Sequence, residues 1–591
     1  MFWFLEDVDR LLHERTALEE RAGSAPWLKG FAWSLPGGEL VVDADIEAHD
    51  HVYQVRMTYP QQFPACLPSV RLRDEASSST RISTHQYMSG ELCLEWAADT
   101  WEPEVTGAQM LESAHRLFEI ENPLGTASVD PREVAPSRHR LTQGQELRFE
   151  FFRFVATSTL RERTRSLADG SNGTITLLYF VFQDKGSALV VQTMTTVDNA
   201  WSDATVPSRI QHYAIVKQGL FYCSDTWRRD AEPNSVAALL SAFDDDEDFR
   251  GRLQGAIETG TAAYLLVIDG ERQLHLLHLS EKDGVVAAIS GIDAAEAFNS
   301  LRVGVETARL RTKRVGIVGL GSAGSKIAVS LARAGVGSFV LVDDDVLLPE
   351  NLVRNDLDWR NVGEHKVDAV ADRLGVIAPG VTIDRRRVRL AGQESNTTTA
   401  GVLRALGECD LIIDATADPE AFNLLSFVAT KSQRMMTWLE VFGGGLGGLV
   451  GRYRPDKDPA PQRMREAFNA YSTTTEDPPA SAGQYQVRDG KGEVLTALDS
   501  DVGVIANWAV HVAIDQLLES EPSLFPYSMY LIGLRRGWIF DAPFHTIPLE
   551  TGPPDKAHAP ETSPESLKAG LDFIGELLAQ STNAASPTDG T

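Results

Sequence analysis

The pattern of hydrophobic and polar positions is clearest around residues 313–345. Two short apolar runs, at 315–318 and 339–342, flank a glycine-rich turn and a stretch at 325–334 that reads as a helix. Short continuous apolar runs are typical of strands that are buried on both faces, as in a parallel sheet. The order therefore predicts a strand, a tight turn, a helix and a parallel strand, which is the first half of a nucleotide-binding βαβ unit.

Nearer the N-terminus, the pattern predicts a smaller α+β unit over residues 1–130. Residues 4–21 read as an amphipathic helix, and a second helix is predicted at 108–118. Two strand-like runs lie between these helices, at 39–45 and 51–58. We expect the strands to be antiparallel, with the two helices covering them.

The rest of the chain predicts a multidomain α/β protein. Further strands are predicted at 174–182, 188–194, 263–268, 274–279, 435–442, 449–453 and 528–540. Helices are predicted at 499–517 and 564–578, and a long loop rich in Pro, Ser and Thr at 454–486. The acidic run at 243–249 is a solvated loop or a metal site, and runs of like charge favour the solvated loop. The predicted parts after residue 130 are a linker and α/β connecting domain at 131–307, a nucleotide-binding domain at 308–550, and a linker, short helix and tail at 551–591.

Composition excludes several classes of function. The chain has 591 residues, a formal net charge of -28 and an isoelectric point near 4.9. Because nucleic acids and anionic membranes bind basic surfaces, we expect neither as a partner. The four cysteines give no disulfide framework and no C-x-x-C zinc pair. The N-terminal segment is too acidic for a secretory signal, and no apolar run approaches the roughly 20 residues that span a bilayer, so we expect a cytoplasmic protein.

The glycine turn carries the candidate chemistry. Gly319, Gly321 and Gly324 have the spacing G-x-G-x-x-G, which lets a backbone turn approach a phosphate at a helix N-terminus. Asp343 lies 19 residues after Gly324, close to the position of the ribose-binding acid of NAD-binding proteins. On the fingerprint alone, an NAD-dependent oxidoreductase therefore remains open.

The residues that follow favour a triphosphate with magnesium. Three carboxylates in succession, at 343–345, repel one another unless a cation neutralises them. Asn351, Arg354 and Lys366 follow within one loop and a short helix. Two cations beside a hard-metal site suit ATP better than a nicotinamide. The alternative is a solvated acidic turn with incidental basic neighbours.

These segments carry a family resemblance. G-L-G-S-A-G-S, A-G-V-G, V-D-D-D-V, N-L-V-R-N and V-G-E-H-K, in this order, resemble the ThiF/MoeB and ubiquitin-activating adenylyltransferases. In that family, a Rossmann-like domain uses ATP to adenylate the C-terminal carboxylate of a ubiquitin-like protein. The resemblance implies ATP and Mg²⁺ as cofactors and a homodimer. For residues 131–307, a degenerate second copy of the activating fold is one interpretation, based on architecture alone.

The resemblance also implies roles for individual residues. Those implied to contact the nucleotide are Gly319, Gly321, Gly324, Ser325, Asp343, Asp345, Asn351, Arg354, Lys366 and Asp414. Asp343 would hold the ribose, whereas Arg354 and Lys366 would grip the triphosphate and act in catalysis. Asp345 would lie near the metal. Asp418 is the second metal candidate, one place after the position, here Ala417, where the family has its metal-binding acid.

The N-terminal unit resembles the ubiquitin-conjugating enzyme fold. The resemblance rests on the helix, the antiparallel strands, Tyr59-Pro60, the G-x-L-C-L turn, W-x-P and the closing helix. It implies that Cys93 is the thioester-forming nucleophile, the alternative being a small buried core residue. The family's H-P-N motif is absent, and His85 occupies the position of its asparagine, eight residues before Cys93. His85 is either a substitute oxyanion donor or a structural residue.

The activating part departs from the family in one respect. Its crossing loop contains no second cysteine, and Cys409 is predicted to be a core residue. Either Cys93 attacks the adenylate directly, or a loop hydroxyl forms an oxyester. The candidate hydroxyls are Ser472, Thr473, Thr474 and Thr475. A hydroxyl is a poor nucleophile without an adjacent base, so direct attack is favoured, and a disordered polar loop is the simplest interpretation of these residues.

The two resemblances together predict a function. The order of the units resembles fusion proteins of bacterial antiphage operons, including CBASS systems. It implies ATP-dependent adenylation of a ubiquitin-like protein or of a cyclic-nucleotide synthase's C-terminal tail, thioester transfer to Cys93, and conjugation to a target amine. Fusion of the two units would raise the effective concentration of the thiol. A non-catalytic scaffold that binds ubiquitin-like proteins is the main alternative, and an NAD-dependent oxidoreductase is the second.

Overall fold

The protein folds into two compact units, Met1–Phe149 and Glu150–Thr591. The computed structural model describes residues 2–73, 85–87, 89–125, 144, 147–182, 186–197, 199–227, 233, 235–280, 284–293, 307–473, 480–483, 486–488, 494–555 and 563–584. The predicted boundary at residue 130 lies outside these residues. None of the described helices is long and apolar enough to cross a membrane.

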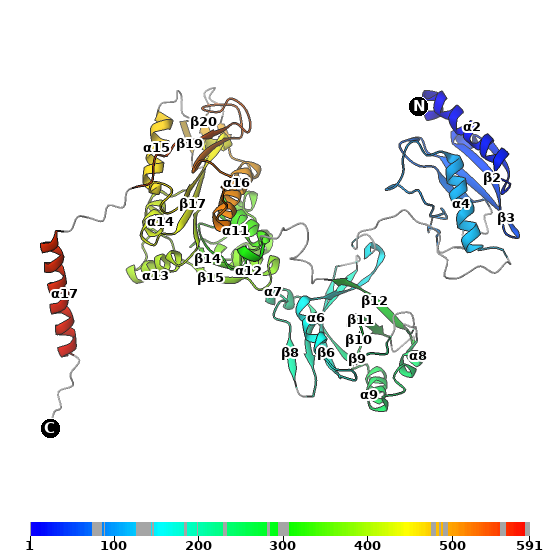
Figure 1. The fold of residues 1–591 in the computed structure, drawn as a ribbon, viewed down its shortest axis with the longest axis horizontal. Coiled ribbons are helices and arrows are strands. Elements are labelled where there is room, and N and C mark those ends of the chain that lie inside the picture. The colour runs from blue at the N-terminus through cyan, green and yellow to red at the C-terminus, as the bar shows by residue number, and fades with distance from the viewer. Residues whose placement is uncertain are drawn as a thin grey trace. The chain divides into compact units, whose positions relative to one another are not determined.

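The first unit is an antiparallel meander with helices packed on it (Figure 1). Its strands are β1 (Leu28–Ser34), β2 (Leu40–Ala48), β3 (His51–Tyr59) and β4 (Ser69–Leu72), in that spatial order. Its helices are α1 (Trp3–Glu6), α2 (Val8–Ser24) and α4 (Gly107–Glu121). Alternate residues of β2 and β3 are buried in one core with the apolar face of α4, as period-two alternation requires. The helix predicted at 4–21 is divided in two, because the Asp7 side chain accepts from Arg10 N–H and starts α2 there.

The connecting part, residues 150–293, is a mixed sheet whose first strand pairs with two other strands. Its strands are β5 (Phe152–Ala156), β6 (Asn172–Val181), β7 (Ser187–Thr195), β8 (Ala200–Ser202), β9 (Ile215–Ser224), β10 (Tyr264–Asp269), β11 (Leu274–Leu279) and β12 (Val286–Asp293). They are ordered β5-β12-β11-β10-β9-β6-β7-β8, and β5 also pairs with β7. Most neighbours are antiparallel. The interpretation as a second copy of the activating fold is therefore wrong, because that fold requires a parallel sheet with crossover helices.

Among the described residues, the helices that accompany this sheet are α6 (Ser158–Arg165), α7 (Ser208–Gln211), α8 (Val236–Ser241) and α9 (Glu247–Glu258). The acidic run at 243–249 starts α9. Asp246 caps that helix by accepting from Phe249 N–H, and Asp244 pairs with Arg250 at 2.9 Å. The carboxylates of this run are thus used as helix-terminal and surface charges.

The nucleotide-binding part has the predicted parallel sheet. Its strands are β13 (Arg314–Val318), β14 (Ser338–Val342), β15 (Thr382–Arg386), β16 (Leu411–Asp414), β17 (Met435–Val441), β18 (Gly447–Tyr453), β22 (Met529–Gly533) and β23 (Thr546–Pro548). The order is β15-β14-β13-β16-β17-β18-β22-β23, with β15 to β17 parallel and the last three antiparallel. The strand order reverses between β13 and β16. In open α/β sheets, ligands bind beyond the carboxyl ends of the strands at such a switch point.

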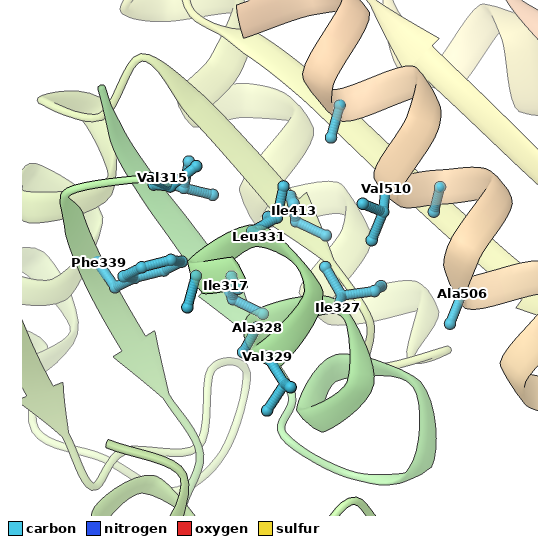
Figure 2. Packing of buried hydrophobic residues seen from close by; sticks show 14 of the residues in the cluster. Val315, Ile317, Ile327, Ala328, Val329, Leu331, Phe339, Ile413, Ala506 and Val510 are labelled. Carbon is cyan, nitrogen blue, oxygen red and sulfur yellow. The ribbon is translucent and has the colours of Figure 1, made fainter. Parts of the chain in front are cut away.

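The helices of this part are α10 (Thr307–Leu310), α11 (Ser322–Ala334), α12 (Lys366–Ile377), α13 (Asn396–Gly407), α14 (Pro419–Lys431), α15 (Pro461–Thr473) and α16 (Asp499–Leu518). One core joins α11, α12 and α16 to one face of the sheet, and Ile413 lies close to Ile327 and Val510 in it (Figure 2). A second core joins α13 and α14 to the opposite face. Burial on both faces explains why the strands read as continuous apolar runs.

Three short turns, a small sheet and a C-terminal helix complete the description of the second unit. They are the 3-10 turns at Pro349–Val353, Trp359–Asn361 and Gly443–Gly445, the small sheet of β19 (Ala480–Gly483), β20 (Gln486–Arg488) and β21 (Val494–Thr496), and the C-terminal α17 (Pro564–Ala584).

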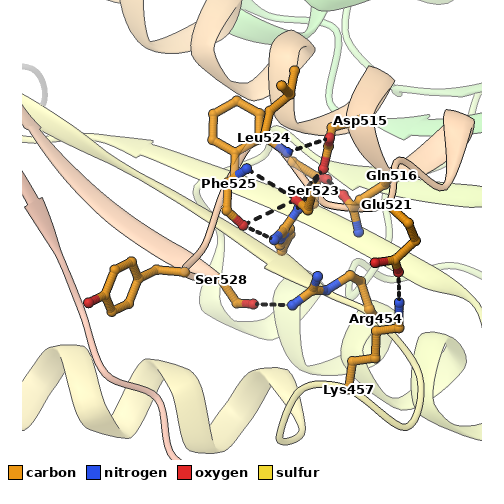
Figure 3. Close-up of polar contacts among 12 residues, drawn as sticks. Arg454, Lys457, Asp515, Gln516, Glu521, Ser523, Leu524, Phe525 and Ser528 are labelled. Atoms are coloured by element: carbon orange, nitrogen blue, oxygen red, sulfur yellow. Dashed lines mark hydrogen bonds and ion pairs between the residues drawn. The ribbon is translucent and has the colours of Figure 1, made fainter.

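A buried ion pair fixes β18 to α16. The Arg452 guanidinium donates to Asp515 Oδ2 at 2.9 Å, and both side chains are almost fully buried. Ser523 donates to the same carboxylate oxygen at 2.6 Å, and Leu524 N–H donates to Asp515 Oδ1 (Figure 3). The charges are therefore satisfied by several hydrogen bonds, which a buried pair needs in order to be tolerated.

Two predictions for this part are wrong. The loop predicted at 454–486 contains α15, whose Met464 is fully buried and whose Phe468 ring stacks on Phe442 at 5.5 Å. Met464, Phe468 and Tyr471 lie at helical spacing, a signal that the Pro, Ser and Thr content of the segment concealed. Of the strands predicted at 528–540, the structure has β22 alone; the chain then turns, and β23 begins at Thr546.

Candidate active site

The three glycines of the turn after β13 are in different steric environments. Gly319 has a φ of +84°, in the region that favours glycine. A Cβ on Gly324 would lie 1.8 Å from the carbonyl oxygen of Gly319, so only glycine lets α11 pack this closely on the turn. A Cβ on Gly321 would meet no atom within 4 Å. The first and third glycines thus build the turn, and the second leaves open space in front of the helix N-terminus.

Asp343 is tied to this turn at the end of β14. Its carboxylate accepts from Leu320 N–H at 2.6 Å and from Asp345 N–H at 2.9 Å. Burial raises the pKa of this carboxyl, and the two N–H donors act in the opposite direction. An acceptor therefore stands beside the glycine turn, where a ribose is expected.

The side chains of Ser325 and Asn355 join the loop after β14 to the glycine turn. Ser325 is fully buried; its hydroxyl donates to Gly321 O at 2.7 Å and accepts from Asp356 N–H at 3.2 Å. Asn355 donates to Leu320 O at 3.1 Å. The contacts of Ser325 are thus with the chain itself. The position of Asn355 was missed from the sequence, although it is the last residue of the N-L-V-R-N motif.

Lys366 and Arg354 have different partners. Lys366 begins α12 and is 7% exposed, and its ammonium lies 2.7 Å from Asp345 Oδ2. The Arg354 guanidinium donates to Ala497 O at 3.3 Å. Lys326 donates to Arg354 O at 2.8 Å and pairs with Asp499. Lys366 and Arg354 are thus each held by an oxygen atom that a phosphate oxygen could replace.

The Asn351 side chain forms a hydrogen bond within its own turn. Its side-chain oxygen accepts from Leu348 N–H at 3.0 Å, which fixes the start of the 3-10 turn that leads to Arg354.

The acids after β16 are engaged with their own turn. Asp414 is 4% exposed and accepts from the backbone N–H and the hydroxyl of Thr416 at 3.0 and 2.7 Å; burial raises its pKa. Asp418 caps α14 by accepting from Glu420 N–H at 2.9 Å. Within the described ranges, no cluster of three or more His, Cys, Asp or Glu side chains could hold a metal. Protein carboxylates alone therefore do not form a cage for Mg²⁺ here.

In the first unit, Cys93 lies on a tight hairpin with His85. Cys93 N–H donates to His85 O at 2.7 Å, Gln86 bridges Leu92, and Tyr87 N–H donates to Glu91 O at 2.8 Å. Gln86 and Leu92 are buried, whereas the Cys93 side chain is partly exposed. The His85 ring lies 4.0 Å from a carboxylate oxygen of Glu121.

The Cys93 thiol contacts a side chain that the sequence did not single out. The Cys93 thiol donates to the Tyr87 hydroxyl at 3.6 Å. Of the other cysteines, Cys66 is exposed, whereas Cys223 and Cys409 are buried. Burial raises the pKa of Cys409 to about 12, as befits the predicted core residue.

A family model matches part of this chain. Residues 296–525 match the model of the ThiF family. The C-terminal half of the chain contains a ThiF-family domain. That match confirms the predicted resemblance of this part to the ThiF family. The matched residues include the glycine turn, Asp343, Lys366 and Asp414.

Individual relatives resemble this ThiF-family domain over part of their length. "ATP-dependent ubiquitin transferase-like protein Cap2" of Enterobacter hormaechei is 34% identical over 148 residues, which is 24% of this chain and 24% of that protein. "Adenylyltransferase and sulfurtransferase uba4" of Aspergillus fumigatus is 37% identical over 237 residues, 39% of this chain and 45% of that protein. The uncharacterized protein y4qC of Sinorhizobium fredii is 33% identical over 193 residues, 31% of this chain and 33% of that protein. The chain matches less than half the length of each.

Among solved structures, Escherichia coli MccB with ATP aligns with a TM-score of 0.31 at 16% identity, over 41% of this chain and 65% of that one. A similarity of this size carries no argument about mechanism.

The ThiF-family domain brings most of the predicted nucleotide residues to one edge of its sheet. The glycine turn, Asp343 and Lys366 are joined by the contacts given above, and Asp414 ends the neighbouring strand β16. The hydroxyls of Ser472 and Thr473 donate to the carbonyls of Asn469 and Ala470 and terminate α15, whereas Thr474 and Thr475 lie outside the described residues. Hydroxyls bonded to backbone carbonyls have no base in these contacts to activate them.

Proposed function

We propose that the ThiF-family domain adenylates the C-terminal carboxylate of a ubiquitin-like or tail-bearing protein with ATP, that Cys93 takes the acyl group as a thioester, and that an amine of a target protein receives it. A role in bacterial antiphage defence belongs to the same proposal. Its main support is the assembly of the glycine turn, Asp343 and Lys366 at the switch point of a ThiF-family sheet.

The residues suggest a division of tasks around the nucleotide. The first N–H groups of α11 lack partners within the helix and carry the positive end of its dipole, so they favour phosphate oxygens. Asp343, fixed by Leu320 and Asp345, would accept from a ribose hydroxyl. Lys366 and Arg354 would exchange Asp345 and Ala497 for phosphate oxygens and offset the charge that develops on pyrophosphate.

The carboxylates fit Mg²⁺ only as partners of the nucleotide. Magnesium in ATP sites is usually held by one or two carboxylates together with phosphate oxygens and water. Asp345 or Asp418 would supply such a carboxylate, after giving up Lys366 or the Glu420 N–H. When bound, the ion would withdraw charge from the phosphates.

The reaction has three balanced steps. A carboxylate oxygen of the substrate tail bonds to the α-phosphorus of ATP, and pyrophosphate leaves. The Cys93 thiolate then bonds to the acyl carbon, and AMP leaves. Finally, an amine nitrogen bonds to the same carbon, the C–S bond breaks, and the amine proton is transferred to the thiolate through solvent. Cys93 of the same chain or of a second copy can supply the thiol, and we include a homodimer in the proposal.

A scaffold that binds a ubiquitin-like protein without turnover is the second candidate. The observation that favours it is that the hydroxyls of Ser472 and Thr473 donate to helix carbonyls, contacts that contain no base to activate them. The same observation leaves Cys93 as the thiol that an enzyme of this kind would use.

Nucleotide binding and loading are tested separately on the full chain. A fluorescent ATP analogue with Mg²⁺ should bind the wild type, bind Lys366→Ala at least about tenfold more weakly, and bind Lys431→Ala, an exposed lysine on α14, as the wild type does. NADH should not displace the analogue. Equal binding by Lys366→Ala, or displacement by NADH, would refute the adenylation proposal.

Transfer is followed with ATP and a panel of ubiquitin-like proteins and peptides with free C-termini. The expected product is a thiol-sensitive adduct that is lost in Cys93→Ser and retained in Cys66→Ser, the matched change of an exposed cysteine. ATP binding without any adduct across the panel would favour the scaffold.

A further inference from the structure

One face of the hairpin around Cys93 carries a set of polar side chains. Because Cys93 pairs with His85 and Gln86 with Leu92, successive side chains alternate between the two faces, and side chains two residues apart share one face. The buried face holds Gln86 and Leu92. The opposite face therefore presents His85, Tyr87, Glu91 and Cys93 together.

Two of these side chains already have acidic or basic partners. The His85 ring lies 4.0 Å from Glu121, and Glu91 accepts from Arg71 at 2.8 Å. The Tyr87 hydroxyl instead contacts the Cys93 sulfur at 3.6 Å, while the Tyr87 side chain stays 44% exposed. It is thus next to the atom that would carry an acyl group and open to the solvent from which an acceptor would arrive.

We infer that the Tyr87 hydroxyl is the hydrogen-bond donor to the acyl oxygen during transfer from Cys93, the task that the sequence alone suggested for His85. This inference rests on the proposed function. An acyl carbon on Sγ lies one bond from the sulfur and its oxygen one bond further, so a hydroxyl 3.6 Å from Sγ is within reach of that oxygen after a small rotation.

The donor acts when charge develops on the oxygen. Attack by the amine converts the thioester carbonyl to a tetrahedral oxyanion, to which the Tyr87 O–H donates without losing its proton. Collapse re-forms the carbonyl and breaks the C–S bond, giving an amide, the Cys93 thiolate and a proton that neutralises it. Burial raises the pKa of Tyr87 to about 12, and the contact with Cys93 acts in the same direction, so the phenol stays protonated at neutral pH.

The experiment uses chemical loading, so that it needs neither ATP nor the natural substrate. The full chain in a Cys66→Ser background is loaded at Cys93 by exchange with a small glycyl thioester, freed of excess reagent, and mixed with lysine amide. Intact-mass spectrometry follows loss of the acyl group. Loading is compared in the wild type, Tyr87→Phe, His85→Ala and Tyr213→Phe, the last removing a hydroxyl from a tyrosine that is 77% exposed in the other unit.

Tyr87→Phe should load normally and transfer to lysine amide at least about tenfold more slowly at saturating amine, with the amine concentration for half-maximal rate unchanged. His85→Ala and Tyr213→Phe should transfer at the wild-type rate. Transfer by Tyr87→Phe at the wild-type rate, or a Cys93 that cannot be loaded, would overturn the inference. Slow transfer by Tyr87→Phe in a protein that fails to bind ATP would leave the inference standing and refute only the proposed adenylation.

Discussion

Replacing Gly324 by alanine should separate the packing role of the glycine turn from its binding role. The added Cβ would lie 1.8 Å from the carbonyl oxygen of Gly319 and 3.2 Å from the Ala415 Cβ. Since non-bonded atoms settle near 3.5 Å, α11 or the turn must move by more than about 1 Å. The atom in the way is backbone and cannot rotate aside. Overpacking of this kind costs about 1–3 kcal/mol, and we expect the upper half of that range.

The matched variant is Gly321→Ala, three residues before Gly324 at the N-cap of α11. Its Cβ would meet nothing within 4 Å, so we expect a loss of stability of about 1 kcal/mol or less, from the helix N-cap position alone. The same Cβ would occupy the open space in front of α11 where a phosphate is proposed to bind. Binding of the ATP analogue should therefore fall at least about tenfold.

Thermal unfolding and analogue titration of both variants give the test. Gly324→Ala should lower the midpoint of the ThiF-domain transition by about 5 °C or more, and Gly321→Ala by clearly less. The reasoning is refuted if Gly324→Ala unfolds at the wild-type temperature, or if Gly321→Ala binds the analogue as tightly as the wild type.

Two further predictions concern buried charges. The pKa of Asp414 is raised in the folded protein, so the unfolded chain loses this proton first as pH rises above about 3.8. The folded protein therefore loses stability as the pH rises from that value to the folded pKa of Asp414. The midpoint of thermal unfolding of Asp414→Asn should rise relative to that of the wild type between pH 4 and pH 7. A difference in midpoint that does not change with pH would contradict this. Arg452→Met leaves Asp515 buried without its cation and should cost about 3–5 kcal/mol, whereas the exposed Arg360→Met should cost little, as measured by urea unfolding. Equal midpoints for the two arginine variants would show that the buried pair is dispensable.

Local spacing in the sequence was enough to predict the βαβ unit. The apolar runs of β13 and β14, the three glycines and Asp343 act over fewer than about thirty residues, and each has a steric or hydrogen-bonding reason that is independent of distant segments. The strands predicted at 39–45, 51–58, 174–182, 263–268 and 274–279 were found for the same reason, because alternation and apolar runs report burial directly. The ThiF-family match supports the interpretation of this part.

Other features depend on tertiary contacts, which residue spacing along the sequence does not reveal. Asp418 accepts from Glu420 N–H, and this contact depends on where α14 begins, which the local spacing did not determine. The pairing of β5 with β7, which makes the connecting sheet return on itself, joins strands that no local pattern relates.

The same distinction separates Cys93 from its partner. The sequence determined that a cysteine follows a glycine turn between two apolar residues, because that pattern is local. Only the fold determined that Tyr87 contacts the sulfur: the hairpin register places Tyr87 and Cys93 on one face, and the His85 ring lies near Glu121 on α4. Side-chain direction follows from pairing and packing across the chain, and those are properties of the folded molecule.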